Sequence, residues 1–81
     1  MKYSEFEREA KTMFMTVSED DEYVYLRDDG DDVATVSRQG MFILDTDYGA
    51  FWFLHSDVQS TILNWCCQLA KTQLEEREDE L

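Results

Sequence analysis

Carboxylates are the side chains of this sequence that could most readily do chemistry. They gather in two short clusters, which consist of Glu19, Asp20, Asp21 and Glu22, and of Asp28, Asp29, Asp31 and Asp32. Closely spaced carboxylates can bind a cation, exchange a proton in acid–base catalysis, or attract a basic partner. Neither cluster shows the apolar flanks of a catalytic pocket, so acid–base catalysis is the least favoured of the three roles.

The second cluster does not have the spacing of a calcium-binding loop. An EF-hand places oxygen ligands at fixed positions before a central glycine and ends on a glutamate. With Gly30 as that glycine, Tyr25 falls on the first ligand position. A loop that begins at Asp45 brings Gly49 one residue early and puts Ser56 in the place of the glutamate. We expect no metal site, and a weak cation contact at the hairpin tip is the remaining alternative.

Other reactive residue types lack the arrangement that their chemistry needs. The segment 55–57 reads His-Ser-Asp, but three consecutive residues cannot adopt the geometry of a catalytic triad. Cys66 and Cys67 are adjacent, so they lack the spacing of a zinc site and cannot pair with each other on a helix. The three glycines stand apart and form no phosphate-binding loop. We expect a protein without enzymatic activity and without a cofactor.

Charge restricts the partners. Nineteen acidic residues face seven basic ones, for a formal net charge of −12. Such a chain repels the phosphates of nucleic acid and of anionic lipid, so we expect a basic protein as partner and no direct contact with nucleic acid or membrane. The longest apolar run, 51–54, is far too short to span a bilayer. Free thiols and the lack of a signal peptide predict a cytoplasmic location.

Local patterns predict one domain over residues 1–81. Ser4 and Glu7 have the spacing of a capping box, and Phe6, Ala10 and Met13 recur at helical intervals, which predicts a helix over 4–13. Strand patterns follow at 23–27, 33–37 and 41–45. Asp29-Gly30 is typical of a two-residue hairpin turn, and Gln39-Gly40 marks a second turn. Residues 14–17 are compatible with an additional first strand, which the pattern leaves open.

The clearest helix is predicted over 56–71. Ser56 and Gln59 form a second capping-box pattern, and the apolar residues recur at steps of three and four: Val58, Ile62, Trp65, Cys66, Leu69 and Ala70, with Leu63 and Cys67 widening the stripe. A third box at 72–75 indicates either a restart or a continuation of this helix. We expect the acidic tail to fray from about residue 75.

These elements predict an α+β fold, a three- to four-stranded antiparallel meander bracketed by an N-terminal helix and a longer C-terminal helix. The aromatic residues at 51–53 and Trp65 are typical of a core, of a homodimer seam or of a binding hot spot. If part of them lies at the surface, the apolar interface would comprise Trp52, Ile62, Trp65 and Leu69.

The sequence resembles a family of small acidic proteins encoded by phages and prophages of lactobacilli and related lactic acid bacteria. The resemblance covers segments 1–7, 33–37, 44–48 with Phe51 and Leu54, and 70–77. The family usually has Thr-Pro where this chain has Thr72-Gln73, and the loss of proline favours a continuous last helix. The family carries no assigned activity, so the resemblance implies a context, a phage-derived accessory protein in a bacterial cytoplasm.

We therefore expect a non-enzymatic accessory protein that acts by binding another protein. In the leading hypothesis the two acidic clusters imitate phosphates and inhibit a basic host protein, either one that binds nucleic acid or a defence protein, as DNA mimics and anti-CRISPR proteins do. The alternative is a structural or assembly factor, or a homodimer, that binds through the apolar face of the C-terminal helix.

Overall fold

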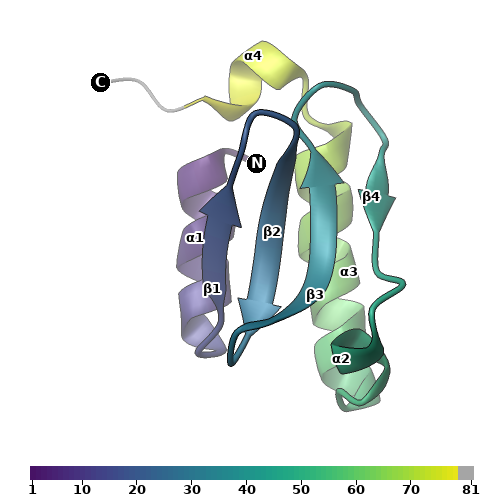
Figure 1. The fold of residues 1–81 in the computed structure, drawn as a ribbon. Helices are drawn as coiled ribbons and strands as arrows, with labels where there is room; N and C mark the ends of the chain where they lie inside the picture. Colours follow the sequence, from purple (N-terminus) through teal and green to yellow (C-terminus); the bar gives the residue numbers. More distant parts are fainter. Residues whose placement is uncertain (79–81) are drawn as a thin grey trace.

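The chain folds into two layers, a four-stranded antiparallel sheet and a pair of long helices that cover one of its faces (Figure 1). The computed structural model describes residues 1–78. Its elements, in chain order, are α1 (Tyr3–Thr12), β1 (Thr16–Glu19), β2 (Tyr23–Asp28), β3 (Asp31–Ser37), β4 (Leu44–Asp45), α2 (Gly49–Trp52), α3 (Ser56–Lys71) and α4 (Leu74–Arg77). The predicted α+β fold, with helices at both ends of an antiparallel meander, is confirmed.

The strands lie in chain order, β1-β2-β3-β4, so each strand pairs with the next. Val24 lies opposite Val36 and Leu26 lies opposite Ala34, and all four side chains are buried on the helical side. Successive residues of a strand point to opposite faces, so Tyr23, Tyr25 and Arg27 of β2 project from the other side. This alternation separates an apolar inner face from a polar outer face.

The β2–β3 hairpin turns as its sequence predicts. Asp29 has φ 53° and Gly30 has φ 86°, and a type I′ turn requires positive φ at both central positions. The stretch before β2 also forms a strand, β1, which occupies Thr16–Glu19 rather than 14–17. The sheet therefore has four strands, the larger of the two numbers expected.

The strand expected over 41–45 is mostly absent, and this prediction was wrong in extent. Only Leu44 and Asp45 form β4. Phe42 has φ 62°, which takes the chain out of the extended conformation, and its N–H donates to the carbonyl of Ala70 at 2.9 Å. A contact with the end of α3 thus replaces ladder pairing over the first part of this segment.

The first helix begins at Tyr3, so the capping box predicted at Ser4 and Glu7 was wrong. Instead the backbone N–H of Lys2 donates to Glu5 Oε1 at 3.0 Å, which makes Lys2 the N-cap, two residues before Ser4. Its far end closes as a Schellman motif, in which Met15 N–H donates to the Ala10 carbonyl and Phe14 N–H to the Lys11 carbonyl. Phe14 sits at φ 59°, the left-handed position that this motif usually gives to glycine.

The long helix α3 has the bounds that its pattern predicts, Ser56–Lys71. Its cap differs from the expected box, because His55 Nδ1 accepts the Asp57 N–H at 3.4 Å and Gln59 instead donates to the carbonyl of Phe51 at 2.9 Å. Leu63 and Cys67 do not widen the buried stripe. Both are exposed, Leu63 to 44%.

The core lies between the two long helices and the inner face of the sheet. Phe6 and Ala10 come from α1, and α3 adds the side chains of Ile62, Trp65, Cys66, Leu69 and Ala70. Burial of this apolar surface is the main term that holds a domain of this size together.

The C-terminal helix ends at Lys71, so the continuous last helix favoured by the loss of proline was wrong. Thr72 has ψ 135°, and a new short helix, α4, follows. Fraying from about residue 75 was also wrong for the described residues, because Arg77 is completely buried. Its guanidinium donates to the carbonyls of Ser37, Ala70 and Thr72 at 2.6, 3.0 and 2.9 Å. The rest of the predicted tail, from 79, lies outside the described residues.

Candidate functional site

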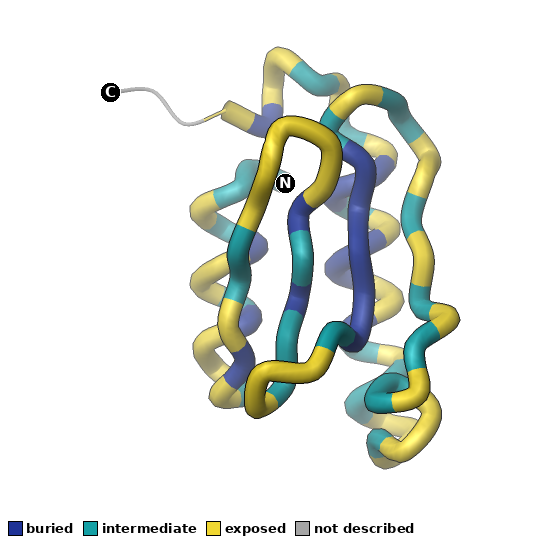
Figure 2. The backbone as a smooth tube through the Cα atoms, in the orientation of Figure 1, coloured by how far each residue is buried: buried dark blue, intermediate teal, exposed yellow. Residues whose placement is uncertain are grey.

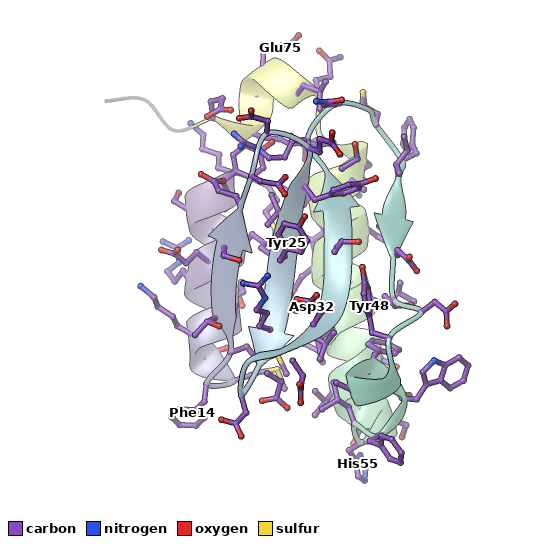
Figure 3. The ribbon with its side chains drawn as sticks, in the orientation of Figure 1. Phe14, Tyr25, Asp32, Tyr48, His55 and Glu75 are labelled. Atoms are coloured by element: carbon purple, nitrogen blue, oxygen red, sulfur yellow. The ribbon has the colours of Figure 1, made fainter. Side chains whose placement is uncertain are left out.

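The outer face of the sheet, which we call the open face, has no helix of residues 1–78 packed on it (Figure 1). Figure 3 shows Tyr25 and Asp32 on this face and Tyr48 beside it, between β3 and β4. Strand register places the following side chains on it: Ser18, Tyr23, Tyr25, Arg27, Asp32, Thr35, Ser37 and Asp45. A sheet face with this density of aromatic and polar groups, left without a covering layer, is a candidate binding surface.

A hollow of about 520 Å³ opens on this face over β2, β3 and β4. We call it the tyrosine hollow, and it is lined by Tyr23, Tyr25, Thr35, Ser37, Ile43, Leu44, Asp45 and Tyr48. The Tyr48 hydroxyl lies 3.2 Å from Thr35 Oγ1, which holds the Tyr48 ring over the edge of β3. The volume of the tyrosine hollow is within the range of small-ligand pockets, about 300 to 1,000 Å³.

A guanidinium of the chain itself occupies the neighbouring part of the open face. The Nε atom of Arg27 lies 2.7 Å from Asp32 Oδ1, and its Nη1 donates to Ser18 Oγ at 2.7 Å. Its Cζ lies 5.1 Å from the centre of the Tyr25 ring. A ring, a carboxylate and a hydroxyl together hold this cation.

The two acidic clusters lie at opposite ends of β2 and do not form one continuous patch. Figure 2 shows both connecting loops as exposed, one at each end of the sheet. The strand between them has six residues, which at about 3.3 Å each span about 20 Å. Apart from Asp32, which lies on the open face beside Arg27, the predicted binding residues therefore bracket this face rather than cover it.

Within the first cluster, Asp20 has a structural role. Its Oδ1 accepts the N–H groups of Glu22 and Tyr23, both at 2.8 Å, and its Oδ2 accepts the Tyr25 hydroxyl at 2.6 Å. The Tyr25 hydroxyl, with those two N–H groups, holds the pKa of Asp20 below its ordinary value of 3.8. The same bond raises the pKa of Tyr25 to about 12. Asp20 thus stabilises the turn, while Glu19, Asp21 and Glu22 present their charge to solvent.

Within the second cluster, Asp32 pairs with Arg27, and Asp29 occupies the turn. Asp28 and Asp31 lie directly opposite each other in the ladder. Like charges in facing positions are destabilising. Over residues 1–78, neither carboxylate makes a hydrogen bond or an ion pair that would offset this repulsion.

The predicted apolar interface is divided by the fold. Ile62 and Leu69 are completely buried and Trp65 is 6% exposed, because α3 turns its apolar face to the sheet. Only Trp52 reaches the surface, 69% exposed, next to Phe53, which is 92% exposed. The apolar face of α3 is core, and this correction removes the interface on which the alternative hypothesis depended.

Comparison with known proteins finds no similar protein. No family model matches the chain. Searches of curated proteins and of solved structures likewise give no match. The site must therefore be interpreted from its own geometry.

Reactive groups elsewhere show little organisation in the part of the chain that the structure describes. No three side chains among His, Cys, Asp and Glu converge in a way that could hold a metal ion there. Burial raises the pKa of the Cys66 thiol to about 12, which keeps it protonated, and Cys67 is exposed. Among residues 1–78, no helix has the length and apolar character needed to cross a membrane.

Sequence reasoning missed the tyrosine hollow. Tyr23 and Tyr25 alternate with Val24 and Leu26, so the period of two already placed both rings on the face away from the core. Tyr48 lies in a loop and has no such pattern. The sequence places Asp45 at the end of an expected strand and at the first position of a calcium loop that fails, and its place on the open face depends on the pairing of β4 with β3.

Proposed function

We propose that the chain is a non-enzymatic binding protein whose open face, with an acidic cluster at either end, receives a basic surface of another protein. The observation that carries the proposal is the placement of the two clusters about 20 Å apart at the two ends of an uncovered sheet face that holds three tyrosines. Carboxylates would supply attraction and orientation, and the tyrosines would supply contact area between them.

The second acidic cluster supports a binding role because it opposes folding. The facing carboxylates of Asp28 and Asp31 repel each other across the ladder and lower the stability of the hairpin. The turn itself requires positive φ at Asp29 and Gly30 and makes no demand for charge on either side. Local features that lower stability without a structural return concentrate at functional sites.

A basic surface that accepts these carboxylates would also bind nucleic acid, because both ligands present spaced negative charge. Binding of this chain would then exclude nucleic acid from the same surface. The sequence resemblance to phage and prophage proteins makes a host protein, one that binds nucleic acid or defends against phage, the target class that we propose. The bacterial cytoplasm is the compartment in which the two would meet.

The experiment is capture of host proteins on the immobilised chain, followed by elution with rising salt. We expect basic, nucleic-acid-binding proteins to be retained and to elute steeply, since exposed charges are screened within about 10 Å at 0.1 M salt. A captured protein should lose duplex DNA when the free chain is added. The chain alone should not retain duplex DNA.

A matched pair of triple variants assigns the surface. In the test variant Asp28, Asp29 and Asp31 become asparagine. In the control Glu7 and Glu75 become glutamine and Asp57 becomes asparagine, which removes the same charge from exposed positions on three helices. Only the test variant should lose the captured protein. Equal losses from both variants, or capture that survives the test variant, would show that the hairpin tip is not the site.

A second candidate function, self-association, is favoured by the exposure of Trp52 and Phe53 on and beside α2. Isolated apolar side chains are common on surfaces, but two adjacent exposed aromatic rings suit an apolar seam. Because two copies with a net charge of −12 repel each other, this association should strengthen with salt, opposite to binding of a basic partner. Sedimentation at several salt concentrations distinguishes self-association from binding of a basic partner. The double variant Trp52→Ser and Phe53→Ser should abolish self-association.

A further inference from the structure

The open face shows how it holds a guanidinium, because it already holds that of Arg27. Three groups contact this side chain: the ring of Tyr25 at 5.1 Å, Asp32 Oδ1 at 2.7 Å and Ser18 Oγ at 2.7 Å. The ring attracts the cation through its negative face, the carboxylate neutralises the charge, and the hydroxyl accepts an N–H.

The tyrosine hollow repeats this set of groups on the other side of Tyr25, without a cation of its own. Its walls carry the rings of Tyr23, Tyr25 and Tyr48 and the carboxylate of Asp45. Neither lysine nor arginine is among the residues that line it. Its polar groups are the Asp45 carboxylate, which only accepts, and hydroxyls, which can accept as well as donate. With the aromatic faces they suit a donor-rich cation.

The carboxylate and the hydroxyls of the hollow are held in position. The N–H of Asp47 donates to Asp45 Oδ1 at 2.8 Å, which orients the carboxylate and leaves lone pairs for a ligand. Tyr48 and Thr35 share one hydrogen bond at 3.2 Å, so the ring of Tyr48 is also fixed. Groups that are held in place before binding lose less conformational entropy when a ligand arrives.

We infer that the tyrosine hollow binds the guanidinium of an arginine side chain from the basic partner. This rests on the proposed function and names the group that the open face recognises. Arginine suits the hollow better than lysine, because its planar guanidinium stacks on aromatic rings and donates two parallel hydrogen bonds to a carboxylate. The volume of about 520 Å³ leaves room for the aliphatic stem of the side chain and for adjacent backbone.

The test uses two capped peptides, one of alternating arginine and glycine and one of alternating lysine and glycine, titrated into the isotopically labelled full chain at low salt. We expect the arginine peptide to shift the backbone resonances of Thr35, Ser37 and Asp45, and the lysine peptide to bind several-fold more weakly. Asp45→Asn keeps the acceptor for the Asp47 N–H and should weaken the arginine peptide about tenfold.

Two controls distinguish binding in the tyrosine hollow from attraction by net charge alone. Asp47→Asn removes the same charge two residues away, outside the lining of the hollow, and should change affinity less than about twofold. Tyr48→Leu should weaken the arginine peptide about fivefold, whereas Tyr48→Phe, which keeps the ring but loses the bond to Thr35, should weaken it less than about twofold.

Each outcome either supports or overturns the inference about the tyrosine hollow. If Asp45→Asn and Asp47→Asn weaken the peptide equally, or if lysine and arginine peptides bind alike, the inference is wrong and attraction by charge alone, the proposed function, still stands. If neither peptide binds at low salt, the proposed function fails together with the inference. Shifts confined to the hollow, with loss in Asp45→Asn and Tyr48→Leu only, support both.

Discussion

Arg77 is completely buried although its side chain carries a permanent charge. In the described part of the chain no carboxylate lies within ion-pair distance of it, and its partners are three backbone carbonyls. Two of these, at Ala70 and Thr72, lie at the C-terminus of α3, where the helix dipole is negative. Arg77 thus gives the Thr72 carbonyl a donor and adds a second donor to the Ala70 carbonyl, which also accepts the Phe42 N–H. Through Ser37 it joins α4 to the end of β3.

Replacement of this residue should destabilise the whole domain. Arg77→Met keeps the length of the side chain but removes the donors to the Ser37 and Thr72 carbonyls, while the Ala70 carbonyl keeps the Phe42 N–H. We therefore expect a loss of about 3 kcal/mol in the free energy of unfolding, measured in urea. Arg77→Lys should fall between this variant and the parent. Arg8→Met, at an exposed position on α1, is the control and should change stability by less than about 0.5 kcal/mol. A parent-like Arg77→Met would mean that these bonds contribute nothing.

The bond between Asp20 and Tyr25 predicts a pH dependence. Because the pKa of Asp20 is lowered in the folded state, its stabilisation is complete above the ordinary value of 3.8 and is lost as pH falls through the lowered pKa. The pKa of Tyr25 is raised to about 12, so the contribution of the tyrosine is complete below its ordinary value of 10.0 and is lost as pH rises toward 12.

The measurement is the free energy of unfolding of Asp20→Asn relative to the parent, across the pH range. The parent should be the more stable at neutral pH, and the difference should shrink at both extremes. Tyr25→Phe should reproduce the alkaline part of the effect, since it removes the same hydrogen bond. A difference that stays constant down to strongly acidic pH would contradict the lowered pKa of Asp20.

At the scale of elements, α1 ends with a strained residue. Phe14 occupies the left-handed position of the Schellman motif at φ 59°, and its ring is 93% exposed, so packing does not offset the strain. Figure 3 shows this ring directed away from the end of the helix. Glycine adopts that conformation without steric cost, whereas every residue with a Cβ atom pays a penalty.

Phe14→Gly should therefore stabilise the chain by about 1 kcal/mol. Phe14→Ala is the matched control, because it removes the same ring but keeps the Cβ atom and hence the strain. We expect only the glycine variant to shift the midpoint of chemical denaturation upward. If alanine gives the same gain, the exposed ring and not the backbone is the source of the strain.

At the scale of the whole molecule, the net charge of −12 on a domain with a radius of gyration of 11.7 Å produces repulsion that acts against the folded state. The two acidic clusters hold eight of the nineteen carboxylates. The unfolded chain spreads the same charges farther apart, so folding brings them closer together. Screening by salt should relieve this cost.

Sodium chloride should accordingly raise the free energy of unfolding, by about 1 kcal/mol between low salt and 0.5 M. The triple variant of Asp28, Asp29 and Asp31 to asparagine should be more stable than the parent at low salt and less sensitive to salt. Thermal or urea unfolding at several salt concentrations measures both effects. Stability that falls with salt would show that attractive ion pairs outweigh the repulsion.

The sequence by itself determined the features that depend on neighbours in the chain. The period of two in β2, the Asp29-Gly30 turn and the spacing of apolar residues over Ser56–Lys71 predicted a hairpin and a helix with nearly correct bounds. These patterns act over a few residues, because backbone conformation and the direction of side chains repeat along one element.

Tertiary structure alone decided the short β4, the burial of Arg77 and the tyrosine hollow. Each depends on a contact between residues distant in sequence: Phe42 with Ala70, Arg77 with Ser37, and Tyr48 with Thr35. Local patterns carry no information about such pairs, because a hydrogen bond between distant segments depends on how the sheet and the helices pack. The open face became a candidate site for the same reason, since only the packing shows which side of the sheet the helices leave uncovered.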